Sequence, residues 1–247
     1  MAGPLRPPRA LLLDLDDTLV VESSGGDDPW EEHLPRLAAE TGAEIARLRD
    51  ALAASRRHFW SDPERHRRGR LDMHGARREV VAGALQALGV QAREVGRAYA
   101  DAVSDTREAR MRPFPGALEA LGAFRRRGLR LALLTNGGAP AQRRKIARFG
   151  LAAHFDAVLV EGELGFGKPD RRVFERALRS LEVDAASAWM VGNDLASDVG
   201  GARAAGLHAV WVDARGTGLP ADAAVRPDRI VRAVAELVEV IGMERDA

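Results

Sequence analysis

The residues best suited to chemistry follow an apolar run near the start of the chain. Leu11-Leu12-Leu13 precede Asp14 and Asp16, and a hydroxyl follows at Thr18. A short apolar run bounded by polar residues suits a buried strand, so both carboxylates are expected at its C-terminal end, on the same side. Two adjacent carboxylates repel each other and lose hydration, and a hard divalent cation such as Mg2+ offsets that cost. The segment therefore predicts a metal-dependent site, with a turn or helix cap as the alternative.

Three further polar segments follow apolar stretches. Thr135-Asn136-Gly137-Gly138 presents a hydroxyl, an amide and flexible backbone before an expected helix, which suits an anion because helix N-termini favour negative charge. Lys168 lies in a glycine-bounded loop, and Asn193-Asp194 follow another apolar run, with Asp198 shortly after. Seen alone, each is also compatible with an ordinary turn, a solvated loop cation or a helix cap. Together they predict one catalytic edge of a sheet.

The elements that would position these residues are of two kinds. Residues 30–110 are almost continuously helix-forming, which predicts an inserted bundle of about four helices. Its breaks are expected near Gly42, Pro63, Gly69 and Gly89. From residue 113 onward strands and helices alternate, which predicts a parallel sheet covered on both faces. The expected strands are 129–135, 155–160, 188–192 and 208–212, and the expected helices are 114–127, 139–149, 171–181 and 195–205.

The composition fits an ordinary enzyme and argues against other classes. A chain of 247 residues can bury a large core as one big domain or as a domain plus a smaller one. The net charge of +1 argues against a nucleic-acid partner, and the lack of cysteine excludes a disulfide framework or a thiolate zinc site. No stretch approaches the roughly 20 apolar residues of a membrane helix. A cytoplasmic monomer or homodimer without a membrane partner is expected.

Taken together, the four segments resemble the haloacid dehalogenase (HAD) superfamily, and its phosphatase branch in particular. They occur in that family's order: Asp-x-Asp-x-Thr at 14–18, Thr135-Asn136, Lys168-Pro169, and Gly192-Asn193-Asp194 with Asp198. The resemblance covers about residues 9–215. It implies an α/β fold, in which a Rossmann-like parallel sheet core (the HAD fold) carries an inserted helical-bundle cap like that of subclass I members. The core domain would be residues 1–20 and 112–247, and the cap domain residues 21–111.

The resemblance also implies roles for individual residues. Asp14 is expected to be the nucleophile that takes the phosphoryl group. Asp16 is expected to protonate the leaving alcohol and later to activate water. Thr135 and Asn136 would hold phosphoryl oxygens, and Lys168 would offset the negative charge of the nucleophile and of the phosphate.

The expected metal ligands depart from the family pattern at one position. Mg2+ would be held by Asp14, Asp16 and either Asn193 or Asp194, while Asp198 is expected to hold Lys168 in place. The family usually has Asp where this chain has Asn193. An amide oxygen coordinates a hard cation without charge and therefore more weakly, although the adjacent Asp194 is able to supply the missing charge.

These features predict a Mg2+-dependent phosphatase that acts on a small phosphorylated metabolite through an aspartyl-phosphate intermediate. The stretch from Thr135 to Glu161, with Gln142 and Lys145, resembles phosphatases of sugar phosphates and nucleoside monophosphates. A phosphomutase is an alternative, because it would retain Asp16. A 2-haloacid dehalogenase is less favoured, because members of that group lack this second acid. A catalytically silent binding or regulatory module is the third alternative.

A cationic stretch in the expected cap is the candidate for substrate selection. Between Arg56 and Arg78 the chain carries eight arginines and three histidines against three acidic residues. Such a run is usually a solvated face. Its functional alternative is that one or two arginines bind an anionic substrate through paired hydrogen bonds. Arg70 and Arg77 are the candidates for substrate binding.

Overall fold

The structure is a computed structural model that describes residues 7–21 and 28–245, with side chains described as far as residue 242. The chain divides into two units. Met1–Val21 and Arg112–Ala247 form the first, here called the sheet unit, and Glu22–Met111 form the second, here called the helical unit.

A parallel sheet forms the centre of the sheet unit. Within the described residues it has six strands, in the order β5-β4-β1-β6-β7-β8. Their bounds are β1 Ala10–Leu13, β4 Arg130–Thr135, β5 Ala157–Val160, β6 Ala188–Gly192, β7 His208–Val212 and β8 Arg229–Val231. All residues of β1 are buried, because this strand lies between β4 and β6 and has helices over both of its faces. A separate antiparallel pair joins β2 (Val20–Val21) to β3 (Arg112–Pro113).

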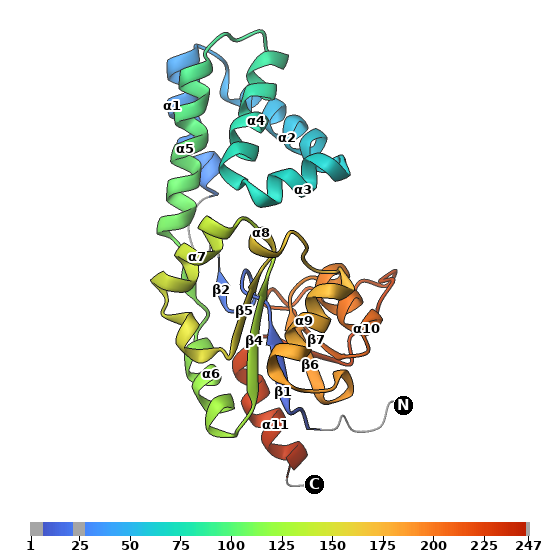
Figure 1. Ribbon diagram of the computed structural model, residues 1–247. Coiled ribbons are helices and arrows are strands. Elements are labelled where there is room, and N and C mark those ends of the chain that lie inside the picture. The colour runs from blue at the N-terminus through green and yellow to red at the C-terminus, as the bar shows by residue number, and fades with distance from the viewer. Residues whose placement is uncertain (1–6, 22–27, 246–247) are drawn as a thin grey trace. The chain divides into compact units, whose positions relative to one another are not determined.

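Helices cover the two faces of this sheet. Figure 1 shows α9 (Arg171–Leu181) and α10 (Gly201–Ala204) on one side of the strands and α6 (Ala117–Arg126) on the other. On the α9 side, Ala10 and Leu12 of β1 share a buried cluster with Val173 and Phe174 of α9. The period-two alternation of β1 therefore places both of its faces in apolar cores. The sheet unit also contains α7 (Ala139–Arg148), α8 (Glu161–Leu164), α11 (Leu237–Arg245), a π-helical turn at Leu195–Gly200, and short 3-10 helices at Leu151–His154, Ala185–Ser187 and Val234–Glu236.

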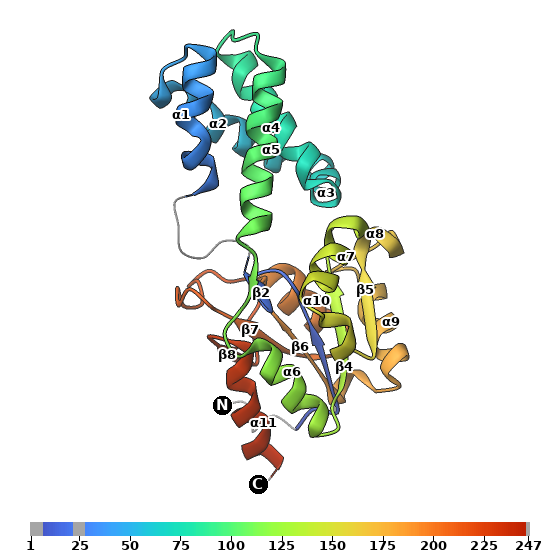
Figure 2. The same cartoon turned by 90° about the vertical axis from the view of Figure 1, so that its left-hand side faces the viewer.

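Five helices make up the described part of the helical unit. They are α1 Pro29–Thr41, α2 Ile45–Ser61, α3 Pro63–Leu71, α4 Met73–Ala87 and α5 Arg93–Ala109. Helices α1 and α5 run side by side (Figure 2), and the contact buries Leu34, Tyr99 and Val103 in one apolar cluster. The cluster explains why a chain segment so rich in arginine still folds as a bundle.

The predicted fold class, an α/β parallel sheet with an inserted helical bundle, is confirmed. A break was predicted near Gly69, and α3 does end close by, at Leu71; the glycine itself is buried inside the helix against Phe59. The break falls at Asp72, whose side chain accepts a hydrogen bond from the N–H of Gly75 and caps α4. The four breaks divide the described helical unit into five helices, where about four were expected.

Candidate active site

The ends of three neighbouring strands bring the predicted site residues to one edge of the sheet. Leu13 of β1 pairs in register with Leu133 of β4 and with Val191 of β6. Asp14 after β1 therefore leaves the sheet between the ends of β4 and β6, and Asn193 after β6 leaves it beside the end of β1. Parallel strands place their carboxyl ends at the same edge, which is where open α/β sheets bind ligands.

Lys168 is buried between two carboxylates. Its Nζ lies 2.6 Å from Asp14 Oδ1 and 2.7 Å from Asp198 Oδ1, and the lysine side chain is only 3% exposed. Burial by itself lowers the pKa of the Lys168 ammonium, but the charges of Asp14 and Asp198 outweigh burial and hold the pKa above its usual value. Lys168 is therefore a fixed cation, and Asp198 holds it as the sequence predicted.

Asp198 reaches Lys168 because residue 192 has no side chain. A Cβ at Gly192 would lie 2.2 Å from Asp198 Oδ2, closer than any side chain allows. The same Oδ2 accepts a hydrogen bond of 3.0 Å from the main-chain N–H of Asp194. The close approach of strand β6 to this carboxylate therefore requires glycine at its last position.

Asp14 is held on both oxygens. Oδ1 accepts from Lys168, and Oδ2 accepts from the Thr18 hydroxyl at 3.0 Å. Burial raises the pKa of Asp14 from 3.8 to about 7, with Lys168 lowering it and Asp198 raising it. Lys168 alone therefore does not fully offset the cost of burying the Asp14 carboxylate.

Asp16 faces a different pair of donors. Lys145 Nζ lies 2.7 Å from its Oδ1, and Gln142 Nε2 lies 2.8 Å from its Oδ2. The chain turns sharply between Asp16 and Thr18, because the residue between them, Asp17, has a φ of 57°. Gln142 and Lys145 were not predicted as site residues. Their spacing of three residues on an expected helix after a polar strand end is the signal that would have placed them on one face.

Thr135 and Asn136 lie at the end of β4 as expected, but most of their polar atoms are already engaged. Asn136 Nδ2 donates to the carbonyl of Lys168 at 2.7 Å, and its Oδ1 accepts from the N–H of Lys168 at 2.8 Å. The Thr135 hydroxyl accepts from Gln142 at 2.8 Å. The N–H of Gly137 donates to the buried Glu161. Asn136 thus positions the Lys168 backbone, a contact that the sequence did not predict.

The four predicted metal ligands are distributed around this edge. Asn193 Oδ1 lies 3.4 Å from the Thr18 hydroxyl, and Trp211 Nε1 donates to the Asn193 carbonyl at 2.8 Å. Asp194 is exposed, and its side chain accepts from the N–H of Ser197 at 2.6 Å as a helix cap. In residues 7–21 and 28–245, no group of three or more His, Cys, Asp or Glu side chains is gathered to hold a metal.

The donor chemistry of these residues nevertheless fits Mg2+. All of the donors are oxygens, and Asn193 would add an amide oxygen to the carboxylates. The raised pKa of Asp14 shows a buried carboxylate that an added cation would stabilise as the anion. The ion itself therefore belongs to the proposal below.

The two predicted substrate-binding arginines lie in the helical unit. Arg77 is buried, with 8% of its surface exposed, and donates to the Ser104 hydroxyl at 3.2 Å. Arg70 is half-buried near the end of α3. The hydrogen bond to Ser104 joins α4 to α5, and a role of Arg77 in substrate binding stays a prediction. Among the residues that the structure describes, no helix is both long and apolar enough to cross a membrane.

Comparisons with known proteins give a family, two phosphatase relatives and a solved structure of similar fold. The family model of the haloacid dehalogenase-like hydrolases matches residues 8–206. The phosphoserine phosphatase of Thermus thermophilus is 42% identical over 205 residues, covering 81% of this chain and 73% of that protein. The glyceraldehyde 3-phosphate phosphatase of Methanopyrus kandleri is 30% identical over 210 residues, covering 83% of each. The solved structure of the HAD-hydrolase YfnB from Bacillus subtilis has a TM-score of 0.69 at 20% identity, covering 96% of this chain and 99% of that one.

The family match spans most of the chain, and the structural likeness shows the shared fold. The predicted resemblance to the phosphatase branch is confirmed, and so is the prediction that the protein is an enzyme, a phosphoric monoester hydrolase. The chain therefore belongs to the haloacid dehalogenase-like hydrolases, as a member of their phosphatase branch.

Proposed function

We propose that the protein is a Mg2+-dependent phosphatase that hydrolyses a small phosphomonoester through an aspartyl-phosphate intermediate, an acyl phosphate, on Asp14. One observation carries the proposal: Asp14 is buried at the sheet edge with one oxygen on the fixed cation Lys168 and the other on Thr18. Phosphoryl transfer depends mainly on positioning and on charge stabilisation, and this arrangement supplies both.

The proposed reaction has two displacements. In the first, a carboxylate oxygen of Asp14 forms a bond to phosphorus while the bond from phosphorus to the ester oxygen breaks, and Asp16 gives its proton to the departing alkoxide. In the second, water attacks phosphorus, Asp16 takes a proton from that water, and the bond to the Asp14 oxygen breaks. Phosphate leaves and both acids return to their starting states.

The other residues stabilise charge in this scheme. Lys168 offsets the charge of Asp14 and of the phosphoryl oxygens, and the Thr135 hydroxyl donates to one of those oxygens. Asn136 contributes by fixing the Lys168 backbone through both of its amide atoms. Asp14, Asp16 and either Asn193 or Asp194 would hold Mg2+, which would supply positive charge that stabilises the phosphoryl oxygens.

The substrate is proposed to be a small phosphate ester of a primary alcohol. Sugar phosphates and nucleoside monophosphates were predicted from the sequence, and the two relatives that cover most of the chain are named for phosphoserine and glyceraldehyde 3-phosphate. Phosphoserine and glyceraldehyde 3-phosphate carry their phosphate on a primary carbon, as do nucleoside 5'-monophosphates and many sugar phosphates. A role for Arg70 and Arg77 in selecting among them stays a prediction, as do a cytoplasmic location and a monomeric or dimeric state.

Two measurements test the proposal. Phosphate release is measured on phosphoserine, glyceraldehyde 3-phosphate, sugar phosphates and nucleoside monophosphates, with Mg2+ and with a chelator. Release that needs Mg2+ supports the proposal, and isomerisation without release would identify a phosphomutase instead. In parallel, Asp14→Asn keeps the size of the side chain but removes the nucleophile, so turnover should be lost. Full turnover by this variant would refute the assignment of Asp14.

A further inference from the structure

We infer that Gln142 and Lys145 of α7 are positioning residues that hold the Asp16 carboxylate in place for proton transfer. The inference rests on the proposed function, because it assigns Asp16 the acid–base step. It extends that function to two side chains outside the four motifs.

Lys145 fixes one oxygen of Asp16. The ion pair is 2.7 Å long and is partly shielded from water, with the Asp16 side chain 31% exposed and that of Lys145 14% exposed. Gln142 and Lys145 are three residues apart, so they lie on the same face of α7. The other carboxylate oxygen is therefore within reach of the second residue on that face.

Gln142 fixes this second oxygen and ties it to the end of β4. The side chain is 3% exposed, and its Nε2 lies 2.8 Å from Asp16 Oδ2, 2.8 Å from the Thr135 hydroxyl and 2.6 Å from the Asn136 carbonyl. Three oxygens surround one terminal atom of the Gln142 amide. That atom is the nitrogen, because an oxygen in its place would be repelled by the carboxylate and the carbonyl. One buried amide thus joins the proposed acid to the proposed phosphoryl-binding hydroxyl.

Asp16 needs such support because the backbone alone does not fix its side chain. Asp16 lies beyond the end of β1, makes a single bridge to Val20, and precedes the left-handed turn at Asp17. Proton transfer requires the acid to lie within hydrogen-bond distance of the departing oxygen, so a rotated carboxylate loses most of its effect. Two donors on two different oxygens restrict both its position and its plane.

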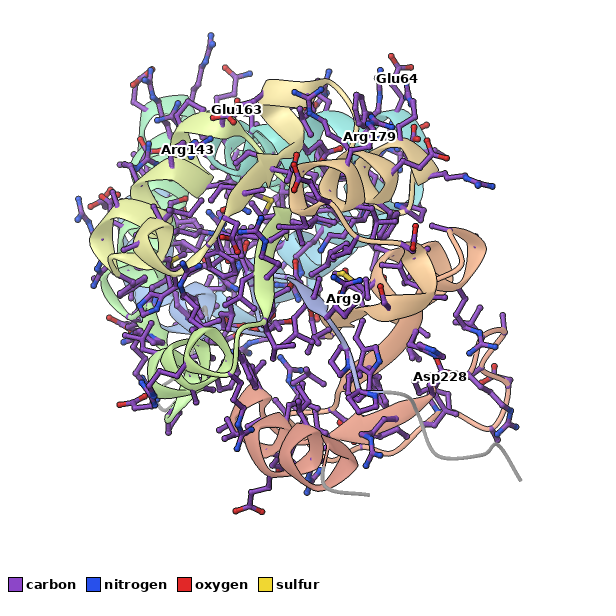
Figure 3. The ribbon with its side chains drawn as sticks, turned by 60° about the horizontal axis from the view of Figure 1, so that its bottom comes forward. Arg9, Glu64, Arg143, Glu163, Arg179 and Asp228 are labelled. Atoms are coloured by element: carbon purple, nitrogen blue, oxygen red, sulfur yellow. The ribbon has the colours of Figure 1, made fainter. Side chains whose placement is uncertain are left out.

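The test compares leaving groups that differ in their need for a proton. The variants Lys145→Met and Gln142→Met each remove one donor while keeping the length of the side chain, and Lys145→Arg restores the charge. The matched control is Arg143→Met, on the same helix: Arg143 pairs at 2.7 Å with the exposed Glu163 (Figure 3). Values of kcat/KM are measured on sn-glycerol 3-phosphate and on p-nitrophenyl phosphate.

Because kcat/KM reports only the steps up to release of the alcohol, it excludes the hydrolysis of the aspartyl phosphate, in which Asp16 acts as a base. The two methionine variants are expected to lose about 100-fold on sn-glycerol 3-phosphate but less than about tenfold on p-nitrophenyl phosphate, whose nitrophenolate leaves without a proton. Arg143→Met should leave both values unchanged. Lys145→Arg should recover about tenfold over Lys145→Met, because this lysine contacts only one carboxylate oxygen.

Equal losses on the two substrates would overturn the inference, since a purely structural role lowers both values together. Failure of Lys145→Arg to exceed Lys145→Met would overturn it as well. These outcomes leave the nucleophile assignment intact, whereas full turnover by Asp14→Asn refutes the proposed function and this inference with it.

Discussion

Replacing Lys168 by methionine removes the cation from the most buried charge cluster of the site. The lysine side chain is 3% exposed, and those of its partners Asp14 and Asp198 are 10% and 2% exposed. Methionine has a similar length and volume, so the substitution leaves no large cavity. Its effect on stability therefore reports the lost charge.

The expected loss at neutral pH is about 3 kcal/mol in the free energy of unfolding. Removing one partner of a buried ion pair costs about 3–5 kcal/mol, because the other charge stays buried without compensation. The lower end of that range applies near pH 7. Burial already raises the pKa of Asp14 to about 7, so this carboxylate relieves part of the cost by taking a proton. Asp198 is then the one charge of the cluster that is left without a compensating partner.

The loss should grow as the pH rises. Because the pKa of Asp14 is raised above 3.8 in the folded state, its contribution to stability is fully present below 3.8 and is lost as the pH passes through about 7. In Lys168→Met the cation that lowers this pKa is absent, so the pKa lies higher still. Above pH 7 the folded variant holds a proton that the folded wild type has released. The difference in stability therefore increases by up to about 1.4 kcal/mol per pH unit.

The assay is urea unfolding at pH 6, 7 and 8 without added metal. Tryptophan fluorescence is followed in a background carrying Trp30→Phe and Trp60→Phe, so that Trp189 and Trp211 report on the sheet unit alone. A difference below about 1 kcal/mol at pH 8 would show that Lys168 does not compensate buried charge. A difference that shrinks between pH 6 and pH 8 would refute the sign of the reasoning.

Two other substitutions test the geometry and the metal ligands. Gly192→Ala should lower the free energy of unfolding by about 1–3 kcal/mol and reduce phosphatase activity, because the new Cβ meets Asp198 Oδ2 at 2.2 Å. The control is Gly200→Ala, whose Cβ would have its nearest neighbour at 3.4 Å. Equal effects of the two substitutions would contradict the explanation. Asn193→Asp should lower the Mg2+ concentration needed for half-maximal activity, because a charged oxygen replaces a neutral one; an unchanged Mg2+ requirement would argue against Asn193 as a ligand.

The sequence predicts the central strands well because their apolar runs end abruptly. Strands β6 and β7 and helix α9 have the predicted bounds, 188–192, 208–212 and 171–181. Strand β8 was not predicted, since three residues at a sheet edge carry too little pattern, and its central Ile230 is 45% exposed. Helix α11 follows it and was also not assigned. Both lie beyond the stretch that the four motifs cover.

Within the site, the sequence predicts the contacts that follow from strand order and misses those that depend on a local turn. Lys168 and Asp198 were expected to meet, and they do, because both follow strands whose ends share one edge. The partners of Asp16 depend on a left-handed residue, Asp17, which turns the chain immediately after that acid. Asp in this conformation is uncommon, and spacing alone does not reveal it. The pairing of Asp16 with Lys145 became visible only in the folded chain.

The balance of charge at this edge gives an independent reason to expect a divalent cation. When Asp14 is in the carboxylate form needed for attack and Asp16 carries the proton that it gives, Asp14 and Asp198 carry two negative charges, which the positive charges of Lys145 and Lys168 just balance. A phosphate monoester adds up to two more negative charges near neutral pH. Each lysine is already within 2.7 Å of a carboxylate, so neither is free to neutralise the substrate by itself. Binding a dianion here without further positive charge would oppose the approach of Asp14 to phosphorus, and a divalent ion held by the neighbouring oxygens removes that repulsion.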